Sequence, residues 1–152
     1  MKNKIVIGVG NYLMSDDGIG CRIIEKLNDI NIDLNFDFED ISNNGMEILS
    51  FLKSDIDTIL IIDSAYMNKN PGEASIFSID DIETNKIIIG NNIHEGDIIY
   101  ILKKYMSILD NNIPRIYFMG IQPYKIEPGF ELSNILSKNM SLYLDMVINF
   151  MK

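Results

Sequence analysis

The stretch KIVIGVGNYLMSDDGIG, residues 4–20, decides the fold that this sequence predicts. It starts with an apolar, β-branched run at residues 5–9, which is typical of a buried strand. A turn follows around Gly10, where a bulkier residue would resist the backbone path. Asp16 and Asp17 come next, directly before a segment with apolar residues at helical spacing. Ligands of open α/β sheets bind at the carboxyl ends of the strands, so this order predicts a functional site at the two acids.

Dinucleotide binding is the common interpretation of such a turn, and the sequence argues against it. The G-x-G-x-x-G pattern requires a glycine at position 13, where the chain has Leu13. Asp16 and Asp17 would also repel a pyrophosphate at the start of the following helix. A carboxylate pair suits a cation better, although either acid could instead cap the helix.

Strand and helix patterns alternate along the chain and predict a three-layer α/β/α fold around a mostly parallel sheet of about five strands. The expected strands lie near residues 4–9, 35–40, 58–63, 74–79 and 115–120. The expected helices lie near residues 17–29, 45–53, 94–108 and 131–151. With 152 residues, the chain is expected to form one domain over residues 1–152.

Two further residues are candidates for the same site. Residues 58–62 form the clearest central strand, apolar on both faces, and Asp63 stands at its carboxyl end. A parallel sheet would bring Asp63 to the edge that carries Asp17. His94, the only histidine, falls in the first turn of an expected helix, where the helix dipole disfavours imidazolium and leaves a lone pair for a metal. The alternatives are a capping or turn role for Asp63 and a structural role for His94.

Composition and charge narrow the class of function. The net charge of −9 argues against nucleic acid and anionic membrane surfaces as partners. No apolar run approaches the roughly 20 residues of a membrane span, and the lack of a signal-peptide pattern favours a cytoplasmic setting. The one cysteine, Cys21, leaves no intramolecular disulfide and no Cys-based zinc site. No histidine follows it closely, so we interpret Cys21 as a packing residue rather than a nucleophile.

The motif GVGNYLMSDDGIG as a whole resembles the N-terminal signature of the hydrogenase maturation endopeptidases. Residues 59–76 are also similar to the family, and the piece NPGEASIFSIDDI closely resembles its corresponding segment. Within residues 117–133, GIQP and EPGFELS resemble the closing motif of the family. The similarity is weaker around His94, where Asn92 replaces the usual serine or threonine two residues before the histidine.

The resemblance implies an M52-type endopeptidase that removes the C-terminal extension of a nickel–iron hydrogenase large-subunit precursor after nickel insertion. It implies that Asp17, Asp63 and His94 are both the catalytic and the metal-binding residues, and that they recognise nickel held by the substrate. No tightly bound cofactor of the enzyme's own is then expected. The family uses the second acid of the pair, so Asp16 is expected to be a turn or capping residue, which Asn could replace at a cost of about 1 kcal/mol or less.

Two other functions stay open on the sequence alone. The same ligands would serve a nickel-sensing chaperone that binds the precursor without cutting it, or a metal-dependent hydrolase of small molecules on the same scaffold. Two carboxylates and one imidazole suit Ni²⁺ or Zn²⁺ with open coordination positions, and Glu95 is the one nearby candidate for a fourth ligand. The metal could polarise the scissile carbonyl or activate a water molecule.

Overall fold

Strands and helices alternate along most of the chain. The computed structural model describes residues 3–52, 55–84, 87–89, 93–109 and 113–152, and all side chains within them except those of residues 83–84 and 93–98. The strands are β1 (Lys4–Val9), β2 (Asp37–Ser42), β3 (Thr58–Tyr66), β4 (Ala74–Ser78), β5 (Ile88–Ile89) and β6 (Arg115–Ile121). The α-helices are α1 (Ile19–Asp29), α2 (Ile48–Phe51), α3 (Asp81–Thr84), α4 (Ile93–Ile108), α5 (Asn134–Lys138) and α6 (Met140–Met151), and the 3₁₀ helices are η1 (Ser15–Gly18) and η2 (Gly45–Glu47). In these ranges no helix combines the length and the apolar character needed to cross a membrane.

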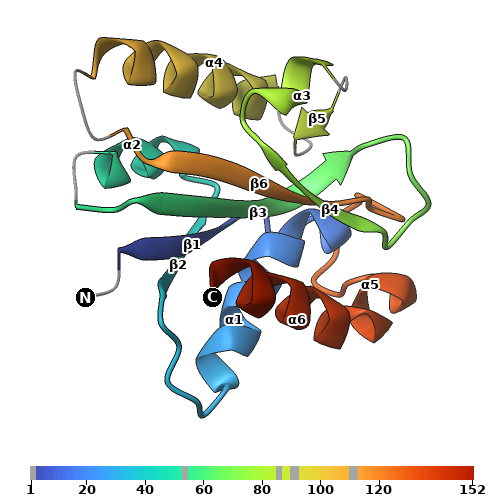
Figure 1. The fold of residues 1–152 in the computed structure, drawn as a ribbon. Coiled ribbons are helices and arrows are strands. Elements are labelled where there is room, and N and C mark those ends of the chain that lie inside the picture. The colour runs from blue at the N-terminus through green and yellow to red at the C-terminus, as the bar shows by residue number, and fades with distance from the viewer. Residues whose placement is uncertain (1–2, 53–54, 85–86, 90–92, 110–112) are drawn as a thin grey trace.

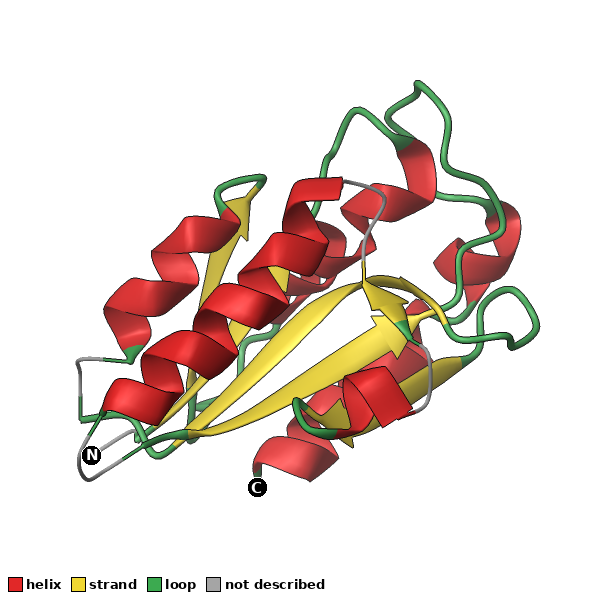
Figure 2. Cartoon of the chain, turned by 90° about the horizontal axis from the view of Figure 1, so that it is seen from above, coloured by secondary structure: helices red, strands yellow, loops and turns green. Residues whose placement is uncertain are grey.

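The strands form one mixed sheet in the order β2-β1-β3-β6-β4, with β5 paired to β3 off this path. The pairs β1–β2, β1–β3 and β3–β6 are parallel, whereas β4 runs antiparallel to β6. Helices α2 and α4 cover one face of the sheet, and α1 and α6 cover the other (Figure 1). Figure 2 shows the same layering from above. The predicted α/β fold with a mostly parallel sheet is therefore confirmed.

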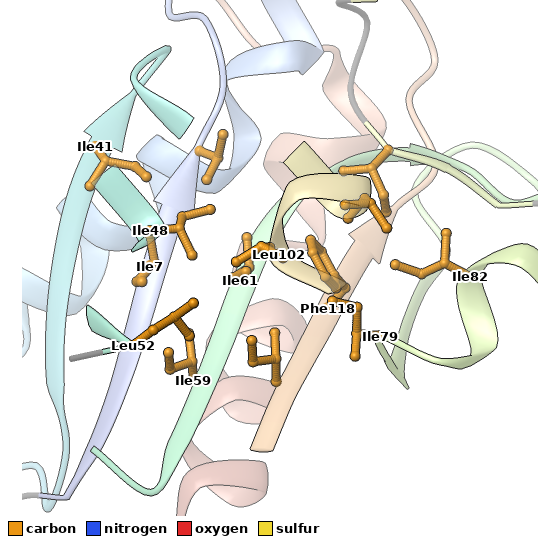
Figure 3. Close-up of a cluster of buried hydrophobic side chains, with 14 of the residues drawn as sticks. Ile7, Ile41, Ile48, Leu52, Ile59, Ile61, Ile79, Ile82, Leu102 and Phe118 are labelled. Carbon is orange, nitrogen blue, oxygen red and sulfur yellow. The ribbon is translucent and has the colours of Figure 1, made fainter. Parts of the chain in front are cut away.

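Each face of the sheet has its own apolar cluster, because successive side chains of a strand point to opposite faces. Ile59 and Ile61 of β3 pack with Leu102 of α4 in one cluster, shown in Figure 3. Leu60 and Ile62 pack on the other face with residues of α1 and α6. The continuous apolar run of β3 thus reflects a strand that is buried on both faces.

Helix α1 lies unusually close to the sheet at its first turn. A β-carbon at Gly20 would collide with the carbonyl oxygens of Val9, the last residue of β1, and of Ile62, in the middle of β3. Only glycine permits this approach. The contact fixes the start of α1, and with it the preceding η1, at the carboxyl end of β1 and beside the middle of β3.

Apart from shifts of one residue, the element bounds differ from the prediction in five places. Strand β3 continues to Tyr66 rather than ending at residue 63, so Asp63 lies within the strand and not at its carboxyl end. The second strand lies at Asp37–Ser42 rather than 35–40, because its pairing with β1 begins at Asp37, opposite Ile5. The first expected helix divides into η1 and α1, and the last into α5 and α6. The expected helix over 45–53 is described as η2 and α2, and residue 53 lies outside the described residues. The short elements β5 and α3 were not predicted.

Candidate functional site

Asp17 and Asp63 are both hydrogen-bonded to Ser64, level with the carboxyl end of β1. Asp17 lies in η1 and is 4% exposed, and Asp63 lies in β3 and is 1% exposed. The Ser64 hydroxyl donates to Asp17 Oδ1 at 2.8 Å, and the Ser64 N–H donates to Asp63 Oδ1 at 2.7 Å. The structure therefore brings together two of the three residues that the sequence assigned to one site.

Gly10 lies between Asp17 and Asp63, where there is no room for a β-carbon. Its φ of +136° lies in the region that favours glycine. A β-carbon there would collide with the carbonyl oxygen of Asp17 and would lie 3.3 Å from Asp63 Oδ1. Gly10 thus lets the turn after β1 pass between η1 and Asp63 of β3.

The start of α4 is connected to the same edge by a short segment of chain. Ile89 of β5 pairs with Ala65, two residues beyond Asp63, and α4 begins at Ile93. Ile89 and Ile99 also line a cavity of about 20 Å³ beside Asp63, with otherwise apolar or glycine walls. His94 is the second residue of α4, as predicted.

The side chains of His94 and Glu95 lie outside the described residues, and Asn92 lies outside them altogether. Among the side chains that the structure describes, no three His, Cys, Asp or Glu residues gather as a metal-binding group. The His94 imidazole lies outside those side chains. Its role as a ligand therefore stays a prediction.

Asp16 has a different role from the one predicted. Its Oδ2 accepts hydrogen bonds from the backbone N–H groups of Tyr124 at 2.9 Å and Lys125 at 3.0 Å, and its Oδ1 accepts one from Ser133 at 2.7 Å. Neither η1 nor α1 has a side-chain cap. The expectation that Asp16 is a turn or capping residue is wrong, because this fully buried carboxylate instead holds a segment more than a hundred residues further along.

That segment, residues 122–133, also packs along the opening motif through its backbone. The Ser15 N–H donates to the Gly129 carbonyl, and the Gly129 N–H donates to the Leu13 carbonyl, both at 2.8 Å. The Ser15 hydroxyl donates to the Glu127 carbonyl at 2.9 Å. Segment 122–133 is therefore fixed against the turn that carries Asp17.

Cys21 is buried and outside the two-carboxylate arrangement. Its thiol donates to the Gly10 carbonyl at 3.7 Å. Burial is the main cause that raises the pKa of the Cys21 thiol well above its usual range, and the nearby Asp40 carboxylate is the second. Hydrogen bonds from Tyr12, Cys21 and Ser42 outweigh the opposing effect of burial and hold the pKa of Asp40 below its ordinary value. A thiolate is thus disfavoured at Cys21, in agreement with a packing role.

Two contacts at this edge were missed by sequence reasoning. Period-two alternation along β3 would have placed Ser64 on the opposite face from Asp63, toward α1 and hence toward Asp17. No local pattern identifies the partners of Asp16, because they lie 108 to 117 residues away along the chain.

Comparison with known proteins gives one consistent family. A family model described as hydrogenase maturation protease matches residues 21–150. The hydrogenase 2 maturation protease of Escherichia coli is 27% identical over 150 residues, covering 95% of this chain and 87% of that protein. A Methanocaldococcus jannaschii protein, provisionally named a hydrogenase maturation protease, is 28% identical over 86 residues, covering 56% of this chain and only 56% of that relative.

The fold comparison agrees with the family model. The structure of the NiFe hydrogenase maturation protease HybD from Thermococcus kodakarensis superposes with a TM-score of 0.78 at 23% identity. The superposition covers 99% of each chain, which shows a shared fold over the full length. The family model spans most of the chain and includes β3, α4 and segment 122–133. We conclude that the chain belongs to the hydrogenase maturation protease family.

Proposed function

We propose that the chain is an endopeptidase that removes the C-terminal extension of a nickel–iron hydrogenase large-subunit precursor after nickel insertion. The observation that carries the proposal is that Ser64 is hydrogen-bonded to two buried carboxylates, Asp17 and Asp63, near the carboxyl ends of the parallel strands. Membership in the family supports the peptide-hydrolase class. The name of the Thermococcus relative, a NiFe hydrogenase maturation protease, supports the nickel–iron class of substrate.

In this proposal the nickel is part of the substrate, and Asp17, Asp63 and His94 recognise it. The donor set fits such an ion, since carboxylate oxygens and imidazole nitrogen bind borderline divalent cations. The walls beside Asp63 are apolar, including Ile61 and Phe118, and a poorly hydrated site strengthens the attraction between a carboxylate and a cation. Three ligands from the enzyme leave coordination positions open for groups of the precursor itself.

The enzyme's own residues bind and orient the metal-bearing end of the precursor. Asp17 and Asp63 are held in place by Ser64, and segment 122–133 is held beside them by Asp16. The nickel, when bound, supplies Lewis-acid chemistry next to the scissile carbonyl. The precursor is then cut only where metal and protein contacts are made together, which couples proteolysis to completed nickel insertion.

The remaining features of the proposal concern setting and partners. We place the reaction in the cytoplasm, with the large-subunit precursor as partner and with neither nucleic acid nor membrane involved. The net charge of −9 supports the absence of polyanionic partners. Residues 1–152 act as one domain, which is supported by the two apolar clusters on opposite faces of the same sheet.

The direct test is to incubate the purified protein with a nickel-loaded large-subunit precursor and to analyse the products by mass spectrometry. We expect one cut near the C-terminus, giving the mature subunit and a released peptide. The variant Asp63→Asn, which keeps the shape of the side chain, serves as the inactive control. Tight binding of an uncut precursor would instead support a chaperone, and turnover of small esters or amides with no cut would support a small-molecule hydrolase.

A further inference from the structure

Ser64 contacts both carboxylates of the candidate site. It follows Asp63 in β3, is fully buried and stands opposite Ile121 of β6 in the sheet register. Its backbone N–H donates to Asp63 Oδ1 at 2.7 Å, whereas its side-chain hydroxyl donates to Asp17 Oδ1 at 2.8 Å. One residue therefore fixes the two acids through two different groups.

The position of Ser64 spans the junction between two elements. Asp63 and Ser64 point to opposite faces of β3, toward the apolar cavity beside α4 and toward α1 respectively. The backbone of Ser64 is held by pairing with β6, which leaves rotation about χ1 as the main freedom of the hydroxyl. Because Asp17 lies on η1, the hydroxyl is a direct link between η1 and β3.

We infer that Ser64 is a positioning residue, whose hydroxyl orients the Asp17 carboxylate relative to Asp63 so that both face the nickel-bearing centre of the substrate. The inference rests on the proposed function, in which these two acids recognise that nickel. Carboxylates that bind metals are themselves held by hydrogen bonds, and removing such a partner typically costs about 10- to 100-fold in metal affinity or activity. Ser64 is thus expected to tune recognition of the metal rather than contact the substrate.

The two hydrogen bonds of Ser64 can be separated by mutation. Ser64→Ala removes the hydroxyl that holds Asp17 and keeps the backbone N–H that holds Asp63. Ser64→Thr keeps a hydroxyl donor. Ser42→Ala is a matched control, because the Ser42 hydroxyl also donates to a carboxylate, Asp40 Oδ1 at 3.0 Å, outside the candidate site.

The experiment compares binding of nickel-loaded and nickel-free precursor to each variant. The processing products identify the scissile bond. A precursor with proline directly after this bond is expected to resist cleavage, and mass spectrometry checks that the precursor stays uncut. For Ser64→Ala we expect affinity for the nickel-loaded form to fall by about tenfold, with affinity for the nickel-free form unchanged. KM for the cleavable, nickel-loaded precursor should rise by a similar factor. Ser64→Thr should restore both values, and Ser42→Ala should match the wild type.

Equal losses for both forms of precursor, or an unchanged preference for the nickel-loaded form, would overturn the inference. If Ser64→Ala does not fold, Ser64→Cys tests the same point, since its thiol has a similar shape but donates more weakly. An Asp17→Asn variant, measured in parallel, distinguishes a failure of the role of Ser64 from a failure of the proposed function. If Asp17→Asn is inactive and Ser64→Ala keeps its preference, only the role of Ser64 fails, whereas an active Asp17→Asn refutes the proposed function.

Discussion

Replacing Asp17 with Asn is expected to abolish processing of the nickel-loaded precursor and to leave the melting temperature almost unchanged. An asparagine oxygen can still accept the hydrogen bond from Ser64, so local packing is retained. The lost negative charge removes the attraction to the metal. Because a metal's stabilisation of the transition state is worth several kcal/mol, we expect kcat/KM to fall by about a thousandfold or more.

The control for this prediction is Asp40→Asn, the same change at a carboxylate outside the candidate site. Asp40 accepts hydrogen bonds from Tyr12 and Ser42, so its loss should lower stability while processing continues. Rates come from mass spectrometry of the precursor over time, and melting from circular dichroism. Near-normal processing by Asp17→Asn would contradict the assignment.

Replacing the neighbouring Asp16 with Asn is expected to have the opposite profile, with a large loss of stability. The carboxylate accepts three backbone N–H groups, using both of its oxygens. Asparagine turns one of these acceptors into a donor that faces another donor. Hydrogen bonds to charged groups contribute about 1.5–3 kcal/mol each, so we expect the free energy of unfolding to fall by about 3 kcal/mol.

Urea denaturation gives the stability of Asp16→Asn, and amide hydrogen exchange shows where protection is lost. The exchange rates of Tyr124, Lys125 and Ser133 should rise first, because these amides donate to Asp16. A loss below about 1 kcal/mol, the value expected for a replaceable cap, would contradict the role seen in the structure. A stable but inactive Asp16→Asn beside an unstable Asp17→Asn would mean that the two roles are reversed.

The sequence predicted the central strand well because burial on both faces leaves a distinct pattern. The apolar run before Asp63 forms the first part of β3, which continues to Tyr66. Gly10 was correctly predicted to lie in the turn after β1. The close approach of Gly20 to the sheet, and of Gly10 to the Asp17 backbone and Asp63, depends on three-dimensional contacts that no local pattern encodes.

Other features depend on long-range contacts or on few residues. Strand β5 has two residues and forms only by pairing with the end of β3, so no periodicity could identify it. The second strand begins at Asp37, two residues later than predicted, and Phe36 is already buried just before it. Asp16 was expected to be a cap because it stands just before a helix in the sequence. Its real partners lie in segment 122–133, far along the chain. The structure places Asp17 and Asp63 on either side of Ser64, whereas their roles in the site and the placement of the His94 side chain stay predictions.

The central claim is that the enzyme recognises nickel held by its substrate. The most direct measurement treats the enzyme with a chelator, removes the chelator, and follows cleavage of nickel-free and nickel-loaded precursor by mass spectrometry. We predict no cut in the nickel-free precursor, a normal cut in the nickel-loaded one, and no cut in either with a folded His94→Ala variant. Cleavage of the nickel-free precursor at the normal site by the chelator-treated enzyme would contradict the roles proposed for Asp17, Asp63 and His94.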